Sequence, residues 1–164
     1  MLTEGKIIAY HGTGNRIDAF GDASIAGHFF TQDKEYAKGY VGGKTPLSLI
    51  DKTKKRRNYL LTVELDINHP LDTKHDPAAV EFYNGKFLPT VNAIHVKYRQ
   101  PELPAIEIGK YVSFIYADPL YRYLTRYESP YDAILVDEDI SDYPAIVPLK
   151  ASQIRILKRE IIKF

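Results

Sequence analysis

Residues 59–67 read Tyr-Leu-Leu-Thr-Val-Glu-Leu-Asp-Ile, and apolar and polar side chains alternate along them from Leu61 onward. Successive side chains of a β-strand point to opposite faces of a sheet, so the apolar residues of this stretch share one face and the polar residues share the other. This alternation predicts a half-buried strand that has one face against a hydrophobic core. The strand is expected to end at residues 68–71, which read Asn-His-Pro-Leu.

On the N-terminal side of this strand, the sequence predicts two shorter strands and a helix. Residues 6–10, Lys-Ile-Ile-Ala-Tyr, have the character of a buried strand, and the two glycines and the asparagine of residues 11–15 indicate a tight turn after it. Residues 28–31 predict a short aromatic strand. Residues 33–40 predict a short helix, which glycines end.

On the C-terminal side, two Asp-Pro pairs and three apolar runs are the clearest signals. Asp76-Pro77 and Asp118-Pro119 each predict a helix start, because aspartate is a favoured N-cap and proline suits the first helical position. Strands are expected at the apolar runs, residues 133–136, 145–149 and 154–157. Together these elements predict a mixed α+β fold with twisted antiparallel β-sheets and short flanking helices in the connections.

The composition is that of one ordinary globular domain. The chain has 164 residues, which fits a single domain over residues 1–164, and its 45% hydrophobic and 26% charged residues exclude a disordered or collagen-like chain. Lys and Arg number 22 against 21 Asp and Glu, so the net charge does not draw the chain to nucleic acid or to an acidic membrane. The absence of cysteine excludes disulfides, thiolate catalysis and cysteine-ligated metals.

Neither a membrane span nor a leader is expected from the sequence. No stretch is apolar over the roughly 20 residues that a membrane-spanning helix needs. Residues 1–7 lack the basic and apolar regions of a Sec-type signal peptide. A cytoplasmic location is therefore expected, and a protein delivered into a host cell without such a signal fits equally well. The oligomeric state stays open.

The segment Tyr10-His11-Gly12-Thr13 is the first candidate for a functional site. A histidine that follows a buried strand and precedes a glycine places an imidazole nitrogen beside exposed backbone groups. These groups can hold a polar ligand together. The alternative is a histidine that only caps a turn, because short motifs often match by chance.

Two aromatic residues suggest a slot for a flat ligand ring. Phe29 falls in the predicted aromatic strand, and Tyr40 falls near the end of the helix that follows. Rings on a strand and on the next helix can face each other, and an offset-stacked pair contributes about 0.5–1.5 kcal/mol beyond burial. The alternative is that both rings belong to the hydrophobic core.

Six segments, taken in order along the chain, form a larger pattern. They are Tyr-His-Gly-Thr at 10–13, Phe-Phe-Thr at 29–31, Tyr-Ala-Lys-Gly-Tyr at 36–40, Leu-Thr-Val-Glu-Leu-Asp-Ile-Asn-His-Pro-Leu at 61–71, Tyr-Asp-Ala-Ile at 131–134 and Gln-Ile-Arg at 153–155. This set resembles the NAD-binding core of ADP-ribosyltransferases of the His-Tyr-Glu class, which includes diphtheria toxin and the poly(ADP-ribose) polymerases. It is most similar to the small transferase domain of phage polyproteins and prophage genes. Residues 72–130 carry no part of the resemblance.

The resemblance implies an ADP-ribosyltransferase-like fold and an NAD site formed by His11, Gly12, Thr13, Phe29, Phe30, Thr31 and Tyr40. It implies that His11 binds the ribose on the adenosine side, that Gly12 holds the nicotinamide carboxamide through its backbone and that Thr13 supports this loop. Tyr40 would stack on the nicotinamide ring, opposite Phe29. Phe29 stands where the family has tyrosine, so the stacking surface is kept and one hydroxyl is lost.

The catalytic acid of the family has no clear counterpart in this sequence. In the family it binds a ribose hydroxyl while positive charge develops on the sugar. Counting back from Gln153 by the interval of the family reaches Ala145, which has no carboxylate. Asp142 is the expected replacement, and Glu138 and Asp139 lie further away in sequence. The alternative is that Asp142 belongs to a solvated acidic turn.

The implied activity is NAD-dependent mono-ADP-ribosyl transfer to a macromolecular acceptor with release of nicotinamide, and the catalytic residues are His11, Tyr40 and Asp142. A protein is the expected acceptor and a nucleic acid is the alternative. The missing acid leaves open a catalytically inactive fold that binds a nucleotide or a protein. An NAD-dependent RNA 2′-phosphotransferase is less favoured, because those enzymes use arginines at the site and only Arg16 is near His11 in sequence. The resemblance is typical of a bacterial or phage-encoded toxin or effector.

Other motifs are weaker. Residues 52–57, Lys-Thr-Lys-Lys-Arg-Arg, favour a solvated loop over a phosphate-binding site, given the balanced net charge. No metal site is expected, because the chain has no cysteine and no pair of histidines at i, i+4 spacing. The chain also lacks a Walker A loop and a Gly-x-Gly-x-x-Gly motif after a strand, which argues against a Rossmann-type dehydrogenase.

Overall fold

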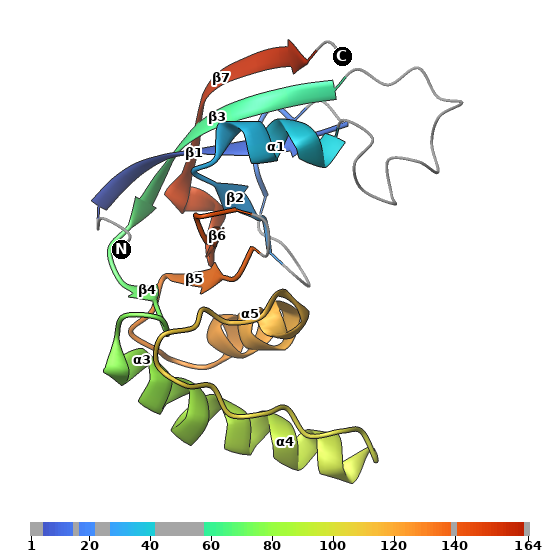
Figure 1. Ribbon diagram of the computed structural model, residues 1–164, viewed down its shortest axis with the longest axis vertical. Coiled ribbons are helices and arrows are strands. Elements are labelled where there is room, and N and C mark those ends of the chain that lie inside the picture. The colour runs from blue at the N-terminus through green and yellow to red at the C-terminus, as the bar shows by residue number, and fades with distance from the viewer. Residues whose placement is uncertain (1–4, 15–16, 22–26, 42–57, 139–140, 163–164) are drawn as a thin grey trace.

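The computed structural model describes residues 5–14, 17–21, 27–41, 58–138 and 141–162, and of Tyr40 and Val41 it describes the backbone alone. These residues form a mixed α+β structure around a seven-stranded sheet, which confirms the predicted α+β class (Figure 1). The strands are β1 (Gly5–Thr13), β2 (Phe30–Thr31), β3 (Asn58–Ile67), β4 (Pro70–Leu71), β5 (Ala133–Val136), β6 (Ala145–Pro148) and β7 (Ile154–Ile162). Their order across the sheet is β4-β5-β6-β2-β1-β3-β7.

The predicted strand at residues 59–67 is confirmed and lies at the centre of the longest ladders. β1 pairs antiparallel with β3 along its whole length, from Gly5 opposite Ile67 to Thr13 opposite Tyr59. β7 pairs antiparallel with the other edge of β3. The apolar face of β3 is fully buried, at Leu61, Val63, Leu65 and Ile67.

Two expectations about the sheet are wrong. β1 continues through Thr13, whereas the glycines predicted a turn from His11 onward, because pairing with residues 59–61 of β3 keeps this segment extended. The sheet is also not antiparallel throughout, since β4 and β5 run parallel. Of the aromatic strand predicted at residues 28–31, β2 comprises only the last two residues.

Both faces of β5 are buried. Ile134 and Val136 belong to a hydrophobic cluster that joins β5 and β6 to the helices. Ala133 and Leu135 belong to a second cluster, which includes the buried faces of β1 and β3. A strand covered on both faces needs apolar residues at every position, and this explains why residues 133–136 form a continuous apolar run rather than an alternating one.

The helices form two groups. Helix α1 (Lys34–Val41) follows β2 and contacts β1 and β3, and the other α-helices lie together beyond β4 and β5 (Figure 1). The second group contains α3 (Pro77–Phe82), the π-helix η1 (Tyr83–Phe87), α4 (Leu88–Lys97), the 3-10 helix η2 (Phe114–Tyr116) and α5 (Ala117–Arg126), and the 3-10 helix η3 (Ala151–Gln153) precedes β7. Within the described ranges, no helix has both the length and the apolarity that crossing a bilayer requires.

One of the two predicted helix starts is confirmed. Asp76 is the N-cap of α3, since its carboxylate accepts a hydrogen bond from the backbone N–H of Ala78 at 3.0 Å, and Pro77 is the first helical residue. The prediction is wrong for Asp118, because α5 begins at Ala117, directly after a turn of 3-10 helix. Asp118 lies in the first turn of α5 and forms an ion pair with Arg122 one turn later.

One aspartate ties together the ends of three strands. The carboxylate of Asp132 accepts hydrogen bonds from the backbone N–H of Asn68 at 2.8 Å and of His69 at 2.9 Å, between β3 and β4. The Nε2 of Gln153 donates to the backbone carbonyls of Asp132 at 2.9 Å and of Asp66 at 3.1 Å. These bonds fix the end of β3 against the starts of β5 and β7.

Two asparagines hold an extended segment against the helices. The side-chain amide of Asn84 donates to the carbonyl of Ile106 at 2.8 Å and accepts from its N–H at 2.9 Å. Asn92 binds Leu103 in the same way, at 3.1 and 2.7 Å. Since residues 101–107 form neither helix nor strand, these amides satisfy backbone groups that lack a regular partner.

We expect Asn92→Ala and Asn84→Ala each to lower the free energy of unfolding by about 1–3 kcal/mol, because each removes two hydrogen bonds to the backbone. Urea denaturation followed by circular dichroism measures the loss. Thr90→Ala is the control, since the Thr90 hydroxyl bonds only the carbonyl of Lys86 in its own helical turns, and its loss should stay within about 0.5 kcal/mol. Equal losses of unfolding free energy in the three variants would contradict a stabilising role of Asn84 and Asn92.

Candidate functional site

A cleft lies where the pairing between β1 and β2 ends. β2 pairs with β1 at one position, Tyr10 opposite Thr31, and His11, Gly12 and Thr13 continue β1 beyond it. The cleft lies at this divergence, is partly open to solvent and has a volume of about 150 Å³, similar to that of a cavity that accommodates a benzene ring. It is lined by Tyr10, His11, Gly12, Gly27, His28, Phe29, Phe30, Thr31, Tyr36, Ala37 and Glu138.

His11 bridges the two diverging strands. Its Nδ1 lies 2.8 Å from the carbonyl oxygen of Phe29, the residue before β2. A carbonyl oxygen only accepts hydrogen bonds, so Nδ1 carries the proton and Nε2 of the neutral ring is left as an acceptor. Burial lowers the pKa of His11, an effect that the Phe29 carbonyl opposes and that the nearby His28 reinforces. The ring is therefore neutral at neutral pH.

Aromatic rings surround His11. The centre of its ring lies 5.3 Å from that of Phe30 and 5.5 Å from that of Phe20, and Phe20 meets His28 edge-on at 5.0 Å. Phe30 is 1% exposed, so this wall of the cleft is continuous with the hydrophobic core. The sequence analysis missed Phe20. Phe20 is an isolated aromatic residue in a polar stretch without periodicity, so no sequence pattern pointed to it.

A carboxylate reaches the cleft from the loop after β5. The Oε2 of Glu138 accepts a hydrogen bond from the hydroxyl of Tyr36 at 2.5 Å, and Tyr36 lies on α1. Helix and loop, which are distant in sequence, therefore meet at the cleft. A phenol donates to a carboxylate without neutralising it, so Glu138 brings negative charge to the cleft.

Short polar contacts fix the start of α1. The Oγ1 of Thr31 accepts from the backbone N–H of Asp33, and Oδ1 of Asp33 accepts from the N–H of Tyr36, each at 3.0 Å. Asp33 is thus the N-cap of the helix predicted at residues 33–40. Its Oδ2 also accepts from the hydroxyl of Ser141 at 3.1 Å, so the same carboxylate holds the loop after β5.

Phe29 contacts a residue outside the resembling segments. Its ring lies 6.1 Å from that of Phe114, centre to centre, in a tilted arrangement. Phe114 begins η2 and is 62% exposed. Phe29, which was predicted to line a ligand slot, thus lines the cleft and also contacts an exposed ring.

The structure brings five of the predicted ligand-binding residues to the cleft, namely His11, Gly12, Phe29, Phe30 and Thr31. Thr13 is 8% exposed at the end of β1 and is not among the residues that line the cleft. Tyr40 lies near the end of α1, and its side chain is outside the described part of the chain, as are Arg16 and the basic run at residues 52–57.

The position of the carboxylate differs from the sequence expectation. Asp142 is exposed and does not line the cleft, and its catalytic role stays a prediction. Ala145 is 1% exposed and pairs with both Thr31 and Val136, so the start of β6 supplies no acid. Among the described residues, the carboxylate that lines the cleft is that of Glu138, which is further from Gln153 in sequence. Asp139 lies outside the described residues.

Comparisons with family models, with curated proteins and with solved structures find no match to this chain. Among the residues that the structure describes, no three His, Cys, Asp or Glu side chains are grouped so that they could hold a metal ion. Among the described residues that line the cleft, the groups available for ligand binding are the imidazoles of His11 and His28, the carboxylate of Glu138, side-chain hydroxyls, strand backbone and aromatic rings.

Gly27 is a position where the cleft tolerates no side chain. Its φ is +74°, and a Cβ built there would lie 2.6 Å from a methyl carbon of Val147. We expect Gly27→Ala to lower the free energy of unfolding by about 2–5 kcal/mol, from backbone strain and overpacking together. Gly109→Ala should cost only about 1–2 kcal/mol, because Gly109 has a φ of +97° but open space around its Cβ position. Urea denaturation that ranks the two variants equally would contradict the steric argument.

The neutral state of His11 predicts an acid dependence of stability. The folded-state pKa lies below the ordinary value of 6.5, so the unfolded chain takes up a proton first as pH falls through 6.5, and the wild type loses stability there. We expect His11→Asn to be less stable than wild type at pH 8, and the difference to shrink between pH 7 and pH 5. Denaturation at each pH measures this difference. A difference that widens in acid would show that the fold favours the charged ring.

Proposed function

We propose that this protein is an NAD-dependent ADP-ribosyltransferase of the His-Tyr-Glu class, with Glu138 in the place of the missing acid. The observation that carries the proposal is the meeting of His11 and Glu138 at one cleft beside the unpaired end of β1. Glu138 is not the carboxylate that the sequence interval of the family favoured, and it comes to the cleft through the fold of the loop after β5. The macromolecular acceptor is expected to be a protein.

The hydrogen-bond network around Asp132 supports the resemblance. Asp132, the backbone of Asn68 and His69, and Gln153 come from three of the six matching segments, and they bond to one another directly. Motifs that match by chance have no reason to meet in space. The helices between β4 and β5 correspond to residues 72–130, which carry no part of the resemblance.

The groups at the cleft fit the parts of NAD that flank its reactive bond. The cleft volume of about 150 Å³ accommodates one aromatic ring, and aromatic side chains line it. Beyond Tyr10, the edge of β1 that faces β2 pairs with no described strand, so the backbone groups that point to this edge can bind a carboxamide. The Nε2 of neutral His11 can accept a hydrogen bond from a ribose hydroxyl.

NAD would supply the ADP-ribosyl group, since its nicotinamide–ribose bond breaks when the acceptor bonds to the ribose carbon. Glu138 would accept a hydrogen bond from a ribose hydroxyl and stabilise positive charge on the sugar. Its hydrogen bond to Tyr36 keeps the carboxylate in one orientation at the cleft. Phe30 and Phe20 keep water from one side of His11. Tyr40 would stack on the nicotinamide ring, as the resemblance implies.

A second candidate function is a catalytically inactive fold that binds a nucleotide or a protein. The observation that favours it is Ala145, a buried apolar residue at the position where the family has its acid. In that case Glu138 would have a structural role, to which its hydrogen bond with Tyr36 contributes. Calorimetry separates the two functions, because tight NAD binding without any nicotinamide release supports the inactive fold.

We expect wild-type protein to release nicotinamide from NAD, and Glu138→Gln to lower kcat about 100- to 1000-fold with little change in NAD binding, because the amide keeps the shape but loses the charge. Tyr40→Ala should weaken NAD binding. Chromatographic measurement of nicotinamide and calorimetric titration with NAD give both quantities.

Asp142→Asn is the matched control, since Asp142 is exposed and does not line the cleft, and its rate should stay within about threefold of wild type. A large loss of rate with Asp142→Asn and none with Glu138→Gln would show that Asp142, not Glu138, is the catalytic acid. Background-level release from wild type, with or without NAD binding, would remove the enzymatic proposal.

A further inference from the structure

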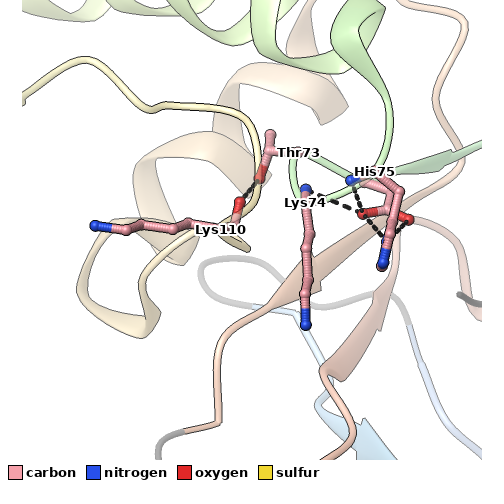
Figure 2. Close-up of polar contacts among 5 residues, drawn as sticks. Thr73, Lys74, His75 and Lys110 are labelled. Carbon is pink, nitrogen blue, oxygen red and sulfur yellow. Dashed lines mark hydrogen bonds and ion pairs between the residues drawn. The ribbon is translucent and has the colours of Figure 1, made fainter.

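A second group of polar side chains lies in the turn after β4, outside the cleft. Asp72 follows the last residue of β4, and residues 73–75 form a turn that leads to the N-cap of α3 (Figure 2). β4 and β5 form the parallel pair of the described sheet, so this turn lies at the edge where their carboxyl ends meet. Edges of this kind commonly carry binding sites in sheets with parallel strands.

The turn is held rigidly. The hydroxyl of Thr73, which is fully buried, donates to the carbonyl of Lys110 at 2.6 Å, and the backbone N–H of Gly109 donates to the carbonyl of Lys74 at 3.1 Å. The backbone N–H of Asp76 donates to the carbonyl of Asp72 at 2.9 Å. The side chains of the turn therefore start from a fixed backbone, which lowers the entropy lost when they bind a ligand.

Asp72 and His75 form a carboxylate–imidazole pair. The Nδ1 of His75 lies 2.9 Å from Oδ2 of Asp72, whose side chain is only 9% exposed. The same carboxylate accepts the backbone N–H groups of Lys74 and His75, each at 3.1 Å. A carboxylate only accepts, so Nδ1 carries the proton and Nε2 is left as the acceptor. The His75 side chain is 35% exposed, and in the described part of the chain no hydrogen bond reaches Nε2.

Two further groups lie beside this imidazole. Tyr111 meets the ring of His75 edge-on at 5.9 Å, and the Nζ of Lys74 lies 5.1 Å from the centre of the Tyr111 ring. The side chains of Lys74 and His75 extend to the same side of the turn, whereas that of Lys110 extends away from it (Figure 2). Burial raises the pKa of Tyr111, with smaller contributions from Asp72 and Asp137, so its hydroxyl stays protonated and can donate.

We propose that Asp72, Lys74 and His75 form a second, separate site for proton transfer, which acts on esters that carry an anionic group. His75 takes a proton from a water molecule that attacks the ester, Asp72 orients the imidazole, and the ammonium of Lys74 binds the anionic group. In the step, a bond forms between the water oxygen and the acyl carbon while the bond from that carbon to the leaving oxygen breaks. The proton held by Nε2 then passes to the leaving oxygen or to solvent.

The balance of charge favours this chemistry over simple anion binding. Asp72 and the exposed Asp137 offset the positive charge of Lys74, so the turn has no excess of positive charge to attract a free anion strongly. A buried carboxylate behind an imidazole instead stabilises the protonated ring that forms when Nε2 takes a proton. Lys74 then needs only to orient a substrate, not to hold it alone.

The test compares two esters of one leaving group, neutral 4-nitrophenyl acetate and anionic 4-nitrophenyl succinate, with release of nitrophenolate followed at pH 7.5. We expect His75→Gln to lower the rate with both esters at least about tenfold. Lys74→Met should lower the rate with the succinate ester and leave the rate with the acetate ester unchanged. Asp72→Asn should lower both rates without changing the preference between the esters, because its Oδ1 still accepts the backbone N–H groups.

His95→Gln is the matched control. The Nδ1 of His95 lies 2.8 Å from the carbonyl of Pro101, so it is a partly exposed imidazole oriented by a backbone carbonyl and not by a carboxylate. Wild-type rates in this variant, together with the losses above, support the site. Equal rates in wild type and His75→Gln, or an unchanged ester preference in Lys74→Met, overturn it. Circular dichroism and thermal melts of each variant establish that a lost rate is not a lost fold.

Discussion

The cleft depends on a mismatch in strand length. β1 pairs with β3 along its whole length, whereas its other edge pairs with β2 at one position only. β2 in turn is anchored to β6, so neither side can move to close the gap after Tyr10 without breaking a ladder. The hydrogen bond from His11 to the carbonyl of Phe29 spans this gap and sets its width. An imidazole is thereby placed beside a part of β1 whose edge toward β2 pairs with no described strand.

The elements around the cleft supply charge and shape separately. Phe30 and the side chains packed against it exclude water and keep His11 neutral, so the sheet side of the cleft is apolar. The negative charge comes from Glu138, on a loop that Asp33 and Tyr36 attach to α1. A charge acts more strongly beside an apolar wall than in water. Moving the loop would therefore change the electrostatics of the cleft without disturbing the sheet.

Local patterns predicted the elements that local physics determines. The alternation in residues 59–67 identified β3 because one face of that strand is buried, and Asp76 identified the start of α3 because capping involves only adjacent residues. The turn expected at His11 is a strand, since pairing with β3 outweighs the preference of glycine. Glu138 was set aside in favour of Asp142 because distance along the chain was the available measure. Its contact with α1 depends on how a loop folds back, which no periodicity records.

The two carboxylate pairs of this protein differ in the partner of the carboxylate, and that difference separates their chemistry. Glu138 bonds a phenol, which is a weak acid and keeps its proton, so the pair holds a fixed negative charge. Asp72 bonds an imidazole, whose second nitrogen is left as a hydrogen-bond acceptor. A carboxylate suits the stabilisation of a cationic sugar, and an imidazole with an accepting nitrogen suits the removal of a proton. The two sites lie at separate parts of one sheet, so each can be changed without rebuilding the other.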